Sequence, residues 1–146
     1  MINRVSDWEQ KLFDVVSSAR EQDFEYGQFD CCLFASRVIG EITGSDPAEQ
    51  FGFDLSYTNR RQAIRELREK GYDSLEEMVE DVAEKRGWDE KDNGFAKRGD
   101  IAIVETNSGF NAVGIVLDHR IALPSSDDEE GLGYEPRKDA KRVWGV

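Results

Sequence analysis

The stretch of sequence that decides the fold is Gly99-Asp100-Ile101-Ala102-Ile103-Val104. Before it, apolar residues recur at the three- and four-residue spacing of helices; from it onward they form short continuous runs, which are typical of strands. Gly99-Asp100 and Asn107-Ser108-Gly109 bound the run, and both segments favour turns. The sequence therefore predicts an α+β protein, with helices first and an antiparallel sheet second.

Further strands are predicted downstream of this run. Residues 112–117 and 120–123 are apolar and are separated by Asp118-His119, which is typical of a tight hairpin turn. Residues 131–134 and 142–146 are expected to extend the sheet.

Four helices are predicted upstream, over about 7–20, 31–43, 59–70 and 74–86. Each is expected to begin at a small polar residue whose side chain caps the first turn. The expected caps are Ser6, Asp30, Thr58 and Ser74, and the expected terminators are Gly44, Gly71 and Gly87.

Composition limits the classes of function. The chain has 146 residues, with 31 Asp and Glu against 19 Lys and Arg, so its net charge is −12. This length predicts one domain over residues 1–146. The acidic charge disfavours nucleic acid and anionic membrane surfaces as partners. No apolar run approaches a membrane span, and we expect no signal segment.

The cysteines and the histidine limit the chemistry further. Cys31 and Cys32 are adjacent and are the only cysteines, which excludes a disulfide framework and a four-thiolate zinc site. His119 is the only histidine, so two-histidine chemistry is excluded. We expect no metal and no cofactor, in a protein made in a reducing cytoplasm.

Cys31 is the candidate nucleophile. A cysteine in the first turn of a helix lies at the positive end of the helix dipole, where free N–H groups stabilise a thiolate. A buried, unreactive cysteine is the alternative, and it is the expected role of Cys32. Asp30 could serve as a catalytic carboxylate or simply as the helix cap. Phe24 and Tyr26 could line a peptide groove or pack over the first helix.

The motifs resemble those of the NlpC family, papain-like cysteine peptidases that cut bacterial cell-wall peptides. Phe24-Glu25-Tyr26-Gly27…Phe29-Asp30-Cys31 is similar to the segment of that family that precedes and includes the nucleophile. The segments 99–104 and 112–117 resemble its Gly-Asp strand and its His-Val-Gly-Ile strand. The resemblance covers residues 24–123 and implies N-terminal helices packed on a small antiparallel sheet or open barrel.

The whole chain also resembles short NlpC-like proteins encoded in phage tail modules. This resemblance implies a protein made in the host cytoplasm and located in the virion tail. Its implied partners are tail-tip and hub proteins, with a cell-wall peptide as a further candidate.

The chain departs from the family at the base. Ala112 stands where the family has histidine, and residues 121–123, where a third polar residue is expected, are apolar. His119 lies seven positions beyond Ala112, roughly 23 Å along an extended chain, and is expected to be a solvated turn residue. Asn111 could orient another group only after a register slip. The resemblance therefore implies a peptidase fold with impaired or absent activity; an active hydrolase that uses Cys31 is the alternative.

Two features leave other interpretations open. The net charge alone is compatible with a small acidic inhibitor of a basic toxin. Arg60, Arg61, Arg65 and Arg68 form a basic helix face, which could pair with the acidic helix over 74–86 or with a partner.

Asp100 is expected to fix the turn before its strand.

Overall fold

The computed structural model describes residues 4–25, 29–45, 57–105, 111–124 and 131–146. The helices are α1 (Trp8–Ala19), α2 (Cys31–Thr43), α3 (Arg60–Glu69) and α4 (Leu75–Arg86), and two short 3-10 turns are η2 (Asn93–Phe95) and η3 (Arg137–Asp139). The strands are β1 (Asp89–Lys91), β2 (Ile101–Glu105), β3 (Asn111–Val116), β4 (Arg120–Pro124), β5 (Leu132–Pro136) and β6 (Arg142–Gly145).

The strands form one antiparallel sheet in the order β1-β6-β2-β3-β4-β5. The predicted α+β class, with helices before strands, is confirmed. β1 was not predicted: its residues are Asp, Glu and Lys, and it is defined by pairing with β6 rather than by an apolar pattern. The turn expected at residues 107–109 lies outside the described residues.

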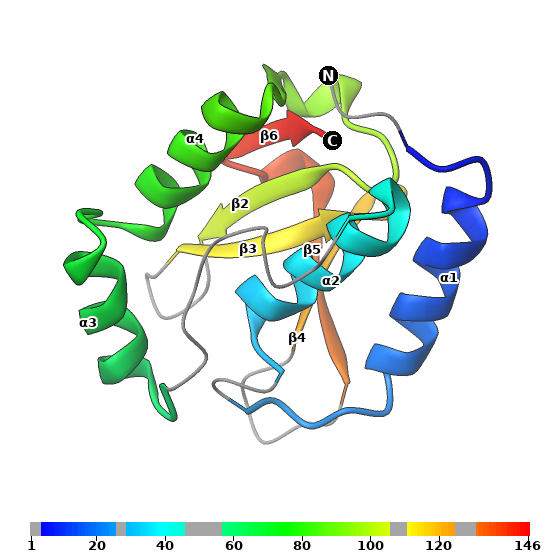
Figure 1. Cartoon of the computed structure of the whole chain (residues 1–146). Coiled ribbons are helices and arrows are strands. Elements are labelled where there is room, and N and C mark those ends of the chain that lie inside the picture. The colour runs from blue at the N-terminus through cyan, green and yellow to red at the C-terminus, as the bar shows by residue number, and fades with distance from the viewer. Residues whose placement is uncertain (1–3, 26–28, 46–56, 106–110, 125–130) are drawn as a thin grey trace.

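Helix α2 lies across the sheet in front of β3, with α1 on one side of it and α3 and α4 on the other (Figure 1). The main core lies between these helices and the sheet, where Ile101 and Ile103 of β2 are buried. Ala102 and Val104 point to the opposite face and belong to a second apolar cluster. Because both faces of β2 are buried from Ile101 to Val104, this part of the strand is continuously apolar instead of alternating.

The sheet opens between β3 and β4. Their register contains only the pairs Ile115↔Ala122 and Val116↔Ile121, whereas β4 pairs with β5 along its whole length. In Figure 1, β4 runs away from the line of β2 and β3. The opening leaves the first half of β3 without β4 beside it, next to the start of α2.

Asp100 holds the start of β2. Its side chain is completely buried and lies 3.0 Å from Arg4 Nη2 and 2.7 Å from Lys91 Nζ. It also accepts hydrogen bonds from the backbone N–H groups of Lys97 (2.9 Å) and Val146 (3.4 Å). The predicted turn-fixing role is confirmed, and the same carboxylate also joins the segments before α1, in β1 and after β6.

The helix caps were predicted in part. The side chains of Asp30 and Ser74 accept the expected hydrogen bonds from Leu33 N–H and Glu77 N–H. The prediction for Ser6 was wrong, because α1 begins after Asp7 in a tight turn in which Trp8 N–H donates to the Val5 carbonyl.

The prediction for Thr58 was also wrong. Its hydroxyl is engaged with the side chain of Gln62, and the extended residue Asn59 caps α3 instead. Gly44 and Gly87 end α2 and α4 in the left-handed conformation, as expected.

Among the described residues, no helix combines the length and apolar character that crossing a membrane requires.

The close approach of β3 and β4 predicts a stability difference between two glycines. A methyl group at Gly114 would overlap Ile121 Cγ2 and lie 3.1 Å from the Ala122 carbonyl oxygen. At Gly133 of β5, the nearest atom would be the Leu123 carbonyl oxygen, 3.9 Å away. We expect Gly114→Ala to lower the free energy of unfolding by about 1–3 kcal/mol, measured by urea denaturation. Gly133→Ala is the matched control, and an equal loss in both variants would contradict this packing.

Candidate cysteine site

Asp30 defines the end of α2 on which Cys31 lies. Asp30 is extended and 4% exposed, and its Oδ1 accepts the Leu33 N–H at 3.0 Å. This is the N-cap geometry that the sequence predicts, and it makes Cys31 the first residue of the helix.

Tyr57 occupies the other oxygen of the same carboxylate. Its hydroxyl donates to Asp30 Oδ2 at 2.7 Å, and the tyrosine is 4% exposed. Burial, followed by the nearby Asp30 charge and the hydrogen bond to it, raises the pKa of Tyr57 far above its ordinary value. Tyr57 is therefore a permanent donor, and both oxygens of Asp30 are engaged in structure.

Tyr57 was not among the candidate site residues, because a tyrosine 27 positions beyond Asp30 carries no local sign in the sequence of its partner. Only the uncapped second oxygen of Asp30 could have suggested that a donor was needed.

The two thiols have different environments. Cys32 is buried in the main core, as expected, whereas Cys31 is half-buried. The hydrogen bond with the Cys32 thiol lowers the pKa of Cys31, and the backbone N–H groups of Val113 and Cys32 act in the same direction; burial and the Asp30 charge oppose them. The same contact and burial raise the pKa of Cys32 well above its ordinary value. Cys31 is therefore the thiol that more readily ionises.

The strand opposite Cys31 offers a backbone donor but no base. Since β4 pairs with β3 only at Ile115 and Val116, the Val113 N–H can be directed at the Cys31 sulfur. Ala112 is 8% exposed and belongs to the second apolar cluster, against which Cys31 also packs. On this side of Cys31, Ala112 therefore presents a methyl group, which cannot accept a proton.

The other polar candidates do not supply a base. His119 is 82% exposed in the turn that follows β3, beyond the end of the strand opposite to Ala112, with Asp118 3.5 Å away. Its expected position in a solvated turn is confirmed.

Asn111 is half-buried, pairs with Glu105 across the sheet, and shows no hydrogen bond to Cys31 within the described part of the chain. Ile121 and Ala122, where a third polar residue was expected, are completely buried and apolar.

The loop before α2 is closed at its base. Glu25 and Phe29 form a β-bridge, and the Phe29 ring packs edge-on against Phe34, with centroids 6.1 Å apart. Phe24 is half-buried beside this bridge, and Tyr26 lies outside the described residues.

The arrangement is suited to nucleophilic attack by the Cys31 thiolate, the first step of thiol catalysis. A thiolate at Cys31, stabilised by the Val113 and Cys32 N–H groups, can attack a carbonyl carbon. Within the described residues, we assign no side chain near Cys31 as a general acid or base. The same residues contain no group of three or more potential metal ligands.

Comparison with known proteins identifies the family. Residues 3–146 match the model of a domain of unknown function, DUF6950. Since the match spans nearly the whole chain, the protein belongs to this family. No curated protein matches it.

The Tyr57 hydrogen bond predicts a specific loss of stability. Tyr57→Phe leaves Asp30 Oδ2 buried without this donor, and we expect it to lower the free energy of unfolding by about 1–3 kcal/mol. Tyr72→Phe is the control, because it removes a hydroxyl that donates to Asp81, a carboxylate near solvent. We expect a markedly smaller loss there. Equal losses in chemical denaturation would contradict a buried structural role for Tyr57.

Proposed function

We propose that the chain is a phage tail protein with an NlpC-like, papain-type fold, whose peptidase chemistry is impaired or absent and which acts in tail assembly or cell entry. The observation that carries the proposal is the pairing of an intact nucleophile position with Ala112 in place of a base. Cys31 begins a capped helix and packs beside β3, in the order of elements that the NlpC resemblance implies.

The missing base argues for a structural role. A general base typically contributes 10²–10⁴-fold to the rate, about 3–5 kcal/mol of activation free energy. Ala112 cannot accept a proton, and the two oxygens of Asp30 already accept bonds from Leu33 and Tyr57. Capping of α2 is supplied by Asp30 and does not require a thiol at the next position, which supports the proposal that the site is the remnant of an enzyme site.

An active cell-wall peptide hydrolase that uses Cys31 is the second candidate. It is favoured by the lowered pKa of the Cys31 thiol and by the Val113 N–H directed at its sulfur. A partner protein that supplies the base would make this function possible in an assembly.

The tail assignment rests on the resemblance of the whole chain to short NlpC-like tail-module proteins. The net charge of −12 is consistent with protein partners, since nucleic acid would be repelled. Tail-tip and hub proteins are the partners that the proposal names.

A digest of purified peptidoglycan tests the loss of activity. We expect wild type to release no more soluble fragments than Cys31→Ser, measured by chromatography with mass spectrometry. Ala112→His places an imidazole at the proposed base position, and we expect a gain of release that the double variant with Cys31→Ser loses. Circular dichroism verifies that each variant is folded. Release by wild type that depends on Cys31 would overturn the impaired assignment in favour of the hydrolase.

The tail location has its own test. Mass spectrometry of purified virions should detect the chain together with tail-tip proteins. Its absence from infective particles would contradict the proposal, whatever the digest shows.

A further inference from the structure

Helix α3 carries an unusual set of exposed arginines for so acidic a protein. Arg61, Arg65 and Arg68 are exposed and lie at i, i+4 and i+7, and the half-buried Ile64 lies beside Arg68, one turn before it. Leu67, on another side of the helix, is buried and anchors it to the core. The exposed arginines are therefore carried by a helix that Leu67 fixes to the core.

The spacing of these arginines costs the helix stability. Arg61 is in the first turn, where the helix dipole disfavours a positive charge. Arg61 with Arg65, and Arg65 with Arg68, are like-charged pairs at helical contact spacing, which repel. Folding of α3 does not account for such a pattern, whereas binding of an anion would relieve it.

The acidic helix does not neutralise them. On α4, Glu76 and Glu80 pair with Lys141 and Arg142, and Asp81 pairs with Lys85. No carboxylate in the described ranges forms an ion pair with Arg61, Arg65 or Arg68. Of the two alternatives left open by the sequence, pairing with α4 is therefore not found.

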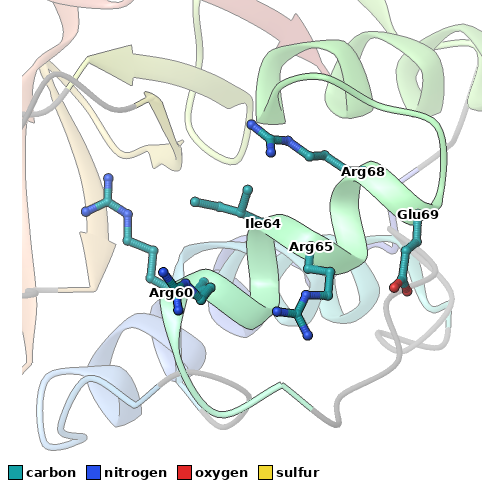
Figure 2. Close-up of a pocket in the computed structure, with 6 residues that line it drawn as sticks. Arg60, Ile64, Arg65, Arg68 and Glu69 are labelled. Carbon is teal, nitrogen blue, oxygen red and sulfur yellow. The ribbon is translucent and has the colours of Figure 1, made fainter.

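The arginines line an open groove together with an aliphatic side chain. The groove is formed by Arg60, Arg61, Ile64, Arg65, Arg68 and Glu69. Figure 2 shows Ile64 between Arg60 and Arg68 on one side of the helix, with Arg65 and Glu69 leaving it on another. An apolar floor at Ile64 with guanidinium groups around it is suited to a ligand that carries both carboxylates and an aliphatic group.

We propose that this α3 groove binds an acidic peptide segment of a partner protein, with carboxylates on Arg61, Arg65 and Arg68 and an aliphatic side chain against Ile64. A short peptide fits better than a nucleic acid because the net charge of the chain is −12. A long polyanion would extend beyond the groove, where the acidic remainder of the surface, including neighbouring α4, repels it within a Debye length of about 10 Å. This proposal does not rest on the tail assignment or on the state of the cysteine site.

Fluorescence anisotropy with the full chain tests the groove. The probe is a labelled Glu-Glu-Leu-Glu-Glu peptide, and Gln-Gln-Leu-Gln-Gln and a single-stranded oligothymidylate are the comparisons. We expect saturable binding of the acidic peptide alone, weakening as salt is added. The triple variant Arg61→Gln, Arg65→Gln, Arg68→Gln should bind about tenfold more weakly or worse.

A matched variant separates the groove from overall charge. Arg20→Gln, Lys97→Gln and Lys138→Gln remove the same three charges from exposed positions outside α3, and we expect binding within about twofold of wild type. Circular dichroism checks the fold of both variants. Should the triple variant unfold, the single exposed change Arg65→Gln should still weaken binding about two- to threefold.

Several results would overturn the proposal. It is contradicted if wild type fails to bind the acidic peptide, binds the neutral peptide equally well, or binds the oligonucleotide more tightly than the acidic peptide. An equal loss of peptide affinity in the matched variant and in the triple arginine variant would contradict it as well. A dimer in sedimentation analysis that the triple variant abolishes would assign the groove to a second copy of the chain and would also overturn it.

Discussion

One buried carboxylate, that of Asp30, holds the region on which the candidate site is built. Its first oxygen caps α2 through Leu33, and its second accepts the Tyr57 hydroxyl, which fixes the segment leading into α3. Because the cap determines where the helix begins, it also determines that Cys31 lies in the first turn, beside the Val113 N–H of β3. An N-cap alone is worth about 1 kcal/mol; the tyrosine bond makes this carboxylate part of the tertiary structure as well.

Asp100 has the corresponding role for the sheet. Like Asp30, it directly precedes an element and is buried, and Arg4 and Lys91 surround it with positive charge. The two aspartates belong to the two motifs on which the NlpC resemblance depends. Both carboxylates serve the architecture, because Asp30 fixes the start of α2 and Asp100 fixes the start of β2. Under the proposed function, these structural roles persist while Ala112 stands in place of a base.

Local patterns in the sequence predicted much of this structure. Contacts between residues far apart in the sequence were not predicted. The apolar run 101–104 predicted β2 because burial on both faces leaves no polar residue in it. The charged β1 could not be predicted, since only its pairing with β6 makes it a strand. At the site, the cap and the position of the candidate nucleophile in the first turn followed from the order Asp30-Cys31. Tyr57 did not, because its direction is set by a contact across 27 residues.

Acylation by p-nitrophenyl acetate tests directly whether Cys31 is a nucleophile without a base. The thiolate attacks the ester carbonyl, a carbon–sulfur bond forms, and nitrophenolate leaves; hydrolysis of the resulting thioester requires a water activated by a base. We expect a burst of one nitrophenolate per chain and an acetyl group retained on Cys31, seen by intact-mass analysis and peptide mapping, with no sustained turnover. Cys31→Ser should show no burst. Continuous turnover that disappears in Cys31→Ser would contradict a nucleophile without a base.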